Sequence, residues 1–300
     1  MKKNILFLIL ILLVLFELCT ADAYCGEVTI VYSANTAGKL RECSCPGDPY
    51  GGLSERVTLI KQLRQQEDPF LLVDAGNMVN VYGKYEIKAS SVIRMMNLMK
   101  YDVAGAGRLE MYNGIEHAHT LGAMAEFPIL STSFTRKETD ELVFEPYVIL
   151  PVNGQKVGIV SVSDSTCFIT VSSKKPEFSL LSLDSSLKPV IEKLAGEVDF
   201  IVALSHMASE GNQKLLARYP QIDLVVQGYG NECFKSPVQT PHGILVAPGQ
   251  RGQFIGLITL MKTGKDSKPV VKRASLIPVL ELQEDEKARE IIVEQYNAMK

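Results

Sequence analysis

The sequence predicts an α/β fold, a sandwich of mixed β-sheets covered by helices. Two patterns carry this prediction. Short apolar runs rich in valine and isoleucine alternate along the chain with segments of helical periodicity, the order expected of repeated β-α units. The loops between them are short, and no Pro-, Gly- or Ser-rich linker divides the chain. We therefore predict one domain over residues 24–300.

The predicted strands are the apolar runs at residues 28–33, 70–74, 102–106, 129–132, 147–151, 156–161, 200–205, 222–227, 244–247, 253–261 and 270–280. Asn153-Gly154 lies between two of these runs and favours the left-handed backbone of a tight hairpin turn. The two strands that flank this dipeptide should therefore pair antiparallel.

Five segments repeat their apolar residues at helical spacing, and they are predicted as helices at residues 53–65, 87–99, 183–194, 213–219 and 284–298. In the first helix, Leu53, Val57, Ile60 and Leu63 fall on one face. Such a face is expected to pack against a sheet.

The N-terminus has the pattern of a secretory signal. Lys2 and Lys3 precede an aliphatic run at residues 5–16, and Ala21-Asp22-Ala23 has the small-x-small spacing that a signal peptidase needs. A bilayer crossing takes about 20 apolar residues, so the run is too short for a comfortable span. We predict that residues 1–23 are cleaved and that the protein is exported, periplasmic or extracellular. An uncleaved N-terminal anchor is the alternative.

Composition restricts the class of partner. The formal net charge is −3 and no basic run is present, which argues against a nucleic acid polymer. No later segment is apolar enough to span a bilayer, so we expect no stable membrane insertion after signal cleavage. The partner predicted is an unidentified small molecule or a thiol redox protein.

Polar or glycine-containing segments follow five of the predicted strands, at residues 33–38, 74–77, 107–110, 204–206 and 227–231. In open α/β sheets, ligands bind where strands end and loops begin. We therefore expect these segments to meet on one face of the molecule and to form its functional site.

In order and spacing these segments resemble the calcineurin-like metallophosphoesterases, and more closely the catalytic domain of the secreted 5'-nucleotidases and UDP-sugar hydrolases. The likeness extends to Gly51-Gly52-Leu53, Tyr101-Asp102, residues 127–131 and Ala247-Pro248-Gly249, and so covers nearly the whole mature chain. It implies a metallophosphoesterase-like α/β sandwich and a two-metal site in which the cations activate water and hold the phosphate oxygens.

The sequence departs from that family at most positions where the resemblance implies a metal ligand. Asn35 and Ala37 replace the first aspartate and its histidine, and Asn77 replaces the aspartate that bridges the two metals. Tyr229 and Asn231 replace the last two histidines. Two nearby dications need anionic ligands, which neutral amides do not supply.

Two further positions complete the expected site. Arg108 and Leu109 replace an Asn-His pair, while Glu110 is kept, and His206 stands where a metal-binding histidine is expected. We predict vestigial metal ligands at Asn35, Asn77, His206 and Asn231, able to hold at most one divalent metal, and a pocket lined by Arg108, Glu110 and Tyr229. The alternative for His206 is a hydrogen-bonded structural residue.

The loop before the first predicted helix contains two closely spaced thiols, Cys43 and Cys45. Its pattern resembles a bacterial branch of the nucleotidase-like proteins, which implies redox or soft-metal chemistry. A helix N-terminus and the charge of Arg41 or Arg56 would favour thiolate, so Cys43 and Cys45 are the candidate catalytic residues. Alternatively, these thiols form structural disulfides with Cys25, Cys167 or Cys233.

Three functional classes therefore stay open for this chain. The preferred one is a 5'-nucleotidase-like protein that is not a standard phosphohydrolase and acts as a thiol-based oxidoreductase or metal site at Cys43 and Cys45. The second is a metal-dependent phosphoric ester hydrolase with an atypical site. The third is a non-catalytic protein that binds a ligand in the vestigial pocket.

Overall fold

The structure is a computed structural model that describes residues 26–41, 51–165 and 177–300. The predicted signal segment and four cysteines, Cys25, Cys43, Cys45 and Cys167, lie outside the described residues.

The first of two large sheets has six strands in the order β14-β13-β1-β2-β3-β4. The bounds are β1 Gly26–Ser33, β2 Leu71–Asp74, β3 Val103–Gly105, β4 Ile129–Leu130, β13 Phe254–Lys262 and β14 Val270–Pro278. The strands β1 to β4 run parallel, whereas β13 pairs antiparallel with both β1 and β14. The carboxyl ends of β1, β2 and β3 therefore reach the same edge of the sheet.

The second sheet also has six strands, in the order β11-β12-β10-β9-β7-β6. The bounds are β6 Tyr147–Val152, β7 Gln155–Ser163, β9 Phe200–His206, β10 Leu224–Gln227, β11 Val238–Gln239 and β12 Ile244–Val246. Within it, β7, β9, β10 and β12 run parallel. A separate two-stranded sheet pairs β5, Phe134–Arg136, with β8, Phe178–Leu180.

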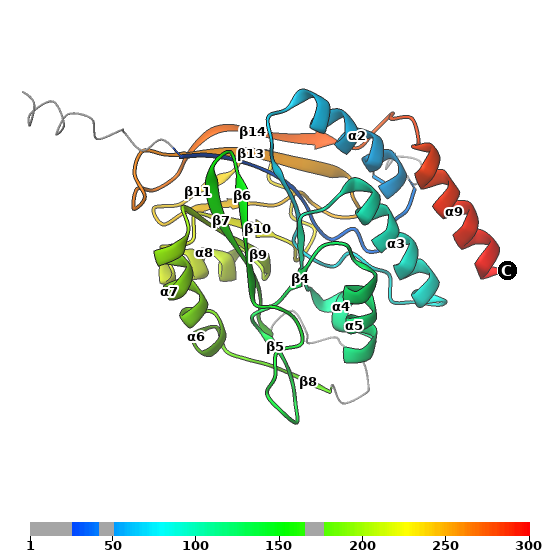
Figure 1. Cartoon of the computed structure of the whole chain (residues 1–300), viewed down its shortest axis with the longest axis horizontal. Coiled ribbons are helices and arrows are strands. Elements are labelled where there is room, and N and C mark those ends of the chain that lie inside the picture. The colour runs from blue at the N-terminus through cyan, green and yellow to red at the C-terminus, as the bar shows by residue number, and fades with distance from the viewer. Residues whose placement is uncertain (1–25, 42–50, 166–176) are drawn as a thin grey trace, which may run out of the picture.

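Helices cover the outer faces of both sheets (Figure 1). The helices α2 Leu53–Gln66, α3 Tyr85–Met99, α5 Ile115–Met124 and α9 Glu286–Met299 pack on the first sheet. The helices α6 Leu183–Ser186, α7 Lys188–Glu197 and α8 Ser209–Arg218 pack on the second, and the short helix α4, Arg108–Met111, follows β3.

A hydrophobic layer between the two sheets holds the sandwich together. Val28 and Ile30 of β1 belong to the same buried cluster as Val202 of β9 and Val226 of β10. All seven residues of β9 are buried, as expected of a parallel strand covered on both faces. This explains why the sequence shows continuous apolar runs in place of strict alternation.

Most predicted elements are present, and the Asn153-Gly154 hairpin is confirmed: β6 and β7 pair antiparallel, with φ angles of 50° and 75° at the turn. The predicted helix at residues 183–194 is wrong in one respect, because it divides into α6 and α7. Ser182 caps α6, and a proline in the first turn of α7 starts a new helix. The short elements α4, α5, β5, β8 and β11 were not predicted. Among the described residues, no helix is both long and apolar enough to cross a membrane.

Candidate functional site

The carboxyl ends of strands from both sheets meet, as the sequence predicted. The side-chain amide of Asn77 donates to Asn35 Oδ1 (3.3 Å), and that of Asn35 donates to the Gly230 carbonyl (2.8 Å). The backbone N–H of Leu109 donates to Asn77 Oδ1 (3.0 Å). We use the name strand-end cluster for Asn35, Asn77, Arg108, Glu110, His206 and Tyr229.

Left-handed backbone shapes the two loops that carry the amides. Asn35, Ala37 and Asn77 have φ angles of 50°, 50° and 57°. Asparagine is enriched in this region, whereas alanine is uncommon there. The loops are joined by backbone hydrogen bonds from Asn35 N to Gly76 O and from Ala37 N to Asn77 O, each 2.8 Å long. The two asparagines therefore also have a conformational role.

Glu110 ties the loop after β2 to helix α4. Its carboxylate accepts the backbone N–H groups of Asn77 (2.9 Å), Met78 (2.7 Å) and Gly107 (2.8 Å). The side chain is fully buried, and burial raises its pKa although these hydrogen bonds act in the opposite direction. Both oxygens of the Glu110 carboxylate accept backbone N–H groups, so this side chain holds the loops of the cluster in place. The sequence predicted that Glu110 lines a pocket, and these contacts do not support that prediction.

His206 ends β9 at the centre of the cluster and is 1% exposed. Burial, followed by the charge of Arg108, lowers its pKa to about 3, and a hydrogen bond with the Gly228 backbone acts in the opposite direction. Its ring meets Tyr229 edge to face at a centroid distance of 5.3 Å. The imidazole is therefore neutral at physiological pH, a state that both a structural histidine and a metal ligand would have.

Two glycines let the strand ends approach this closely. A Cβ atom on Gly107 would lie 2.9 Å from both Asn77 Oδ1 and His206 Nδ1. A Cβ atom on Gly228 would lie 2.0 Å from the Ala75 carbonyl oxygen. Side chains at these positions would separate the two sheets at the site.

The loop after β10, which carries Tyr229 and Asn231, is held by a polar network that the sequence analysis missed. Gln227 accepts from the Ser209 hydroxyl and the Asn212 amide, both at 2.9 Å, and donates to the Tyr229 carbonyl (3.1 Å) and to Glu232. Asn231 itself is exposed. A glutamine that ends a buried strand was the available sequence signal.

A buried arginine supports the loop after β1. Arg56 is 0% exposed and donates to Thr36 Oγ1 (3.0 Å) and to the Tyr101 hydroxyl (3.2 Å). Ser33 joins the same network through Tyr101 (2.7 Å) and Asp74 (2.6 Å). These contacts fix the backbone from which Asn35 projects.

Cys43 and Cys45 lie outside the described residues, but the ends of their loop are described. Arg41 is held by Glu284 through Nε (2.9 Å) and Nη2 (3.3 Å). Since Arg56 is also engaged, the contacts give no support to the prediction that either guanidinium stabilises a thiolate.

The described cysteine, Cys233, is exposed. Its backbone forms an isolated antiparallel β-bridge with Pro248, and a Cβ atom on Gly249 would lie 3.4 Å from Cys233 Cβ. Three residues along, the carbonyl of Arg251 packs on Gly51, the first residue after the Cys43–Cys45 loop, and its N–H donates to Asn35 O (2.8 Å). Segment 248–251 therefore contacts Cys233, Gly51 and Asn35.

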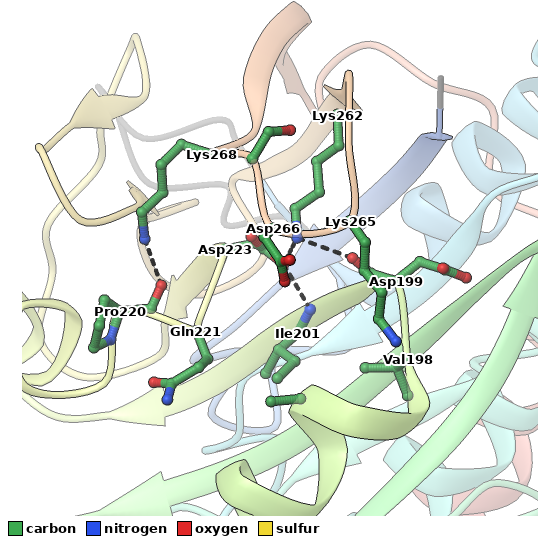
Figure 2. Close-up of a pocket in the computed structure, with 12 residues that line it drawn as sticks. Val198, Asp199, Ile201, Pro220, Gln221, Asp223, Lys262, Lys265, Asp266 and Lys268 are labelled. Carbon is green, nitrogen blue, oxygen red and sulfur yellow. Dashed lines mark hydrogen bonds and ion pairs between the residues drawn. The ribbon is translucent and has the colours of Figure 1, made fainter. Parts of the chain in front are cut away.

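A second region with charged groups lies at the opposite, amino ends of β9 and β10, beside a cavity of about 320 Å³ (Figure 2). There Lys262 of the first sheet forms an ion pair with Asp223 of the second (2.8 Å), and both side chains are nearly buried. Lys262 also donates to Asp199 O (2.9 Å), and Asp223 accepts from Ile201 N (2.9 Å). This ion pair therefore links the two sheets.

The other lysines of this cavity also bind backbone carbonyls. Lys268 donates to the carbonyls of Pro220 and His242, and Lys265 donates to that of Gly196 (3.2 Å). Their contacts fasten the β13–β14 hairpin to neighbouring loops. We therefore interpret the side chains around this cavity as contacts that hold the sheets and loops together. The strand-end cluster is the better candidate for a functional site.

The chain is similar in sequence to known 5'-nucleotidases. The chain is 29% identical over 222 residues to the 5'-nucleotidase of Homo sapiens, covering 68% of this chain and 38% of that protein. The chain thus spans less than half the length of this relative. No family model matches the chain.

Solved structures with other sequences share the architecture. The NAD nucleotidase of Haemophilus influenzae superposes with a TM-score of 0.79 at 16% identity, over 92% of this chain and 60% of that chain. A calcineurin-like phosphoesterase from Bacillus subtilis gives 0.76 at 19% identity, over 92% and 98% of the two chains. The predicted fold is confirmed: this chain has the mixed α/β fold of calcineurin-like phosphoesterases and 5'-nucleotidases.

Proposed function

We propose that this 5'-nucleotidase-like protein does not hydrolyse phosphate esters by a two-metal mechanism. The observation that supports the proposal best is Asn77, whose amide oxygen accepts the Leu109 N–H and whose amide nitrogen donates to Asn35. An amide engaged in this way is a poor replacement for a carboxylate between two dications. Among residues 26–41, 51–165 and 177–300, no three His, Cys, Asp or Glu side chains are grouped to hold a metal. The described donor set therefore does not fit a metal pair.

Steady-state assays with manganese, zinc, cobalt or magnesium test this proposal on nucleotides and a generic phosphodiester. We expect negligible turnover by the mature protein, because the bridging carboxylate and most imidazole ligands are replaced. Turnover of about 1 per second or more, abolished by His206→Gln, would instead favour the atypical phosphoesterase. The matched control is His242→Gln, on an exposed turn away from the cluster.

Thiol chemistry at Cys43 and Cys45 is the second candidate. It is supported by Gly51, the first described residue after these cysteines, which packs on the segment that contacts both Asn35 and Cys233. A disulfide between Cys43 and Cys45 would be strained and therefore easier to reduce than a structural bridge. In the reaction proposed, the two thiols give up two electrons and two protons to a disulfide-bearing partner and become joined.

Titration against dithiothreitol buffers tests the thiol candidate. We expect a two-electron transition at a potential above about −300 mV, lost in Cys43→Ser and kept in Cys233→Ser. If mass spectrometry instead joins each thiol to a distant cysteine, the loop is structural, and reduction should cost about 2–4 kcal/mol of stability. Free thiols with no transition would leave a non-catalytic binding protein as the better account.

Export and domain organisation complete the proposal. We propose that residues 1–23 are removed as a secretory signal and that residues 24–300 form one nucleotidase-like domain in the periplasm or outside the cell. N-terminal sequencing of the protein recovered from its native host should begin near Tyr24. A start at Met1 would contradict cleavage.

A further inference from the structure

We propose that a second copy of this chain docks on the outer face of helix α9, so that two molecules pair through antiparallel α9 helices. The docking surface is a row of five exposed residues that we call the α9 stripe: Glu286, Glu290, Val293, Tyr296 and Lys300. This inference is independent of the proposed function, because the stripe shares no residue with the strand-end cluster.

The α9 stripe has exposed apolar side chains at its centre. Its members follow one another at intervals of four, three, three and four residues, which places them on one face of a helix. Val293 and Tyr296 are 51% and 64% exposed, whereas Ile291 and Ile292 of the same helix are buried in the core beside the first sheet. Helix α9 therefore has a second apolar face, and this face is directed at solvent.

The apolar surface continues beyond the stripe. Figure 1 shows α9 at the outer edge of the molecule. Lys84 Nζ donates to the Met299 carbonyl (2.7 Å) and so brings the segment before α3 to the C-terminal end of α9. Tyr82 in that segment is 68% exposed. Of the six exposed large hydrophobic side chains in the described part of the chain, four therefore lie on α9 or beside it, a concentration typical of a protein interface.

The charges of the α9 stripe favour a second copy of the same chain as the partner. Its N-terminal end carries the carboxylates of Glu286 and Glu290, and its C-terminal end carries the Lys300 ammonium. A twofold axis makes every contact occur twice, and antiparallel helices bring the acidic end of each stripe to the basic end of the other. With Val293 of each copy packed on Tyr296 of the other, Glu290 and Lys300 of the two copies lie within about 1.5 Å along the helix axis.

Neighbouring charges leave this arrangement open. Arg289 is held by Glu284 (3.0 Å), and Glu294 is held by Arg94 (2.6 Å). The Lys300 ammonium lies 4.5 Å from the centroid of the Tyr296 ring, so the basic group is next to the apolar centre. An anionic lipid surface is a poorer match, because the carboxylates at the other end of the stripe would repel it.

Sedimentation equilibrium of the mature protein over a concentration series tests this proposal. We expect a reversible dimer with a micromolar dissociation constant, since a single helix face forms a small interface. Val293→Glu should raise this constant about tenfold or more, because it places a carboxylate at the apolar centre. The matched control is Val270→Glu on β14, where the valine is 53% exposed, and it should leave the constant unchanged. Circular dichroism of both variants checks that they are folded.

Charge reversal tests the antiparallel pairing. Glu290→Lys and Lys300→Glu should each weaken the dimer about threefold to tenfold, because each creates two like-charge contacts. The double variant should restore the dimer, because it exchanges the two charges and keeps them complementary.

Four results would overturn the inference: a monomer at about 300 μM protein, a dimer unaffected by Val293→Glu, equal weakening by Val270→Glu, or no rescue in the double variant. A monomer that binds vesicles of phosphatidylcholine and phosphatidylglycerol, and loses this binding in Val293→Glu, would assign the surface to lipid instead. None of these measurements depends on hydrolysis or thiol chemistry, so the proposed function and this inference can fail separately.

Discussion

The two ends of the sandwich treat polar groups in opposite ways. At the amino ends of β9 and β10, Lys262 and Asp223 form a nearly buried ion pair across the two sheets. At the carboxyl ends, Asn35, Asn77 and His206 are neutral and hydrogen-bond to one another's loops or to backbone. Both arrangements hold the same two sheets together.

The difference concerns the kind of contact that joins the two sheets at each end. Three partners surround the Lys262 ammonium: the Asp223 carboxylate, the Asp199 carbonyl and the Phe200 ring at 4.9 Å. At the carboxyl end, the Asn35 amide donates across the two sheets to the Gly230 carbonyl (2.8 Å). The amino end is therefore joined by a buried charge pair, and the carboxyl end by hydrogen bonds between uncharged groups.

The largest effect is expected at the amino end. Lys262→Met leaves Asp223 buried and unpaired, and should lower the free energy of unfolding by about 3–5 kcal/mol, measured by urea denaturation. The double variant Lys262→Met, Asp223→Leu should recover most of this loss, because it removes both charges. If Lys262→Met were as stable as the parent protein, the ion pair would not stabilise the contact between the sheets.

The next effect concerns pH at the carboxyl end. Since the pKa of His206 is about 3 when folded and 6.5 when unfolded, the unfolded chain binds more protons between these values. Stability should therefore fall as pH drops from about 6.5 toward 3, by roughly 3–5 kcal/mol from this residue. The measurement is urea denaturation at a series of pH values, with His206→Gln giving a flatter profile. Parallel profiles for both proteins would contradict a neutral, buried imidazole.

Close packing at the carboxyl end predicts a smaller loss. Gly228→Ala brings a methyl group against the Ala75 carbonyl and should destabilise the protein by about 1–3 kcal/mol. Gly196→Ala in α7 meets nothing within 4 Å and should stabilise it by up to about 1 kcal/mol. Thermal unfolding of the two variants measures both changes in stability. Equal shifts in melting temperature would refute the close approach of the sheets at Gly228.

The smallest effect is expected at the rim of the cluster. Arg41→Gln removes an exposed contact with Glu284, and exposed ion pairs contribute about 0–1 kcal/mol. If thiol chemistry exists at Cys43 and Cys45, its potential should also be unchanged, because the Arg41 charge is already paired. A shift of the potential in this variant would restore the predicted link between Arg41 and the thiols.

The fold was readable from sequence because buried parallel strands appear as continuous apolar runs, as in β9. Strand-end residues such as Asn35, Asn77 and His206 were found for the same reason, since each follows such a run. Helix α5 was missed because its buried residues, Ile115, Ala118 and Leu121, include a small alanine that weakens the apolar pattern.

Contacts between side chains that are far apart in the sequence could not be predicted from local patterns. The Lys262–Asp223 pair spans 39 positions and joins different sheets, so no local pattern predicts it. The role of Glu110 likewise depends on how the loop after β2 docks on α4. In both cases the partner is selected by tertiary packing, and residue type alone does not reveal it.

The buried Arg56 has a consequence for the order of folding. A guanidinium carries five N–H donors, so burying it removes water that acceptors of the protein must replace. Its enclosure requires Thr36, Tyr101 and Gly252, which come from three distant parts of the chain. Water leaves the guanidinium completely only after all three segments have packed around it. We therefore expect α2 to dock fully in a late kinetic step, which Arg56→Met should accelerate.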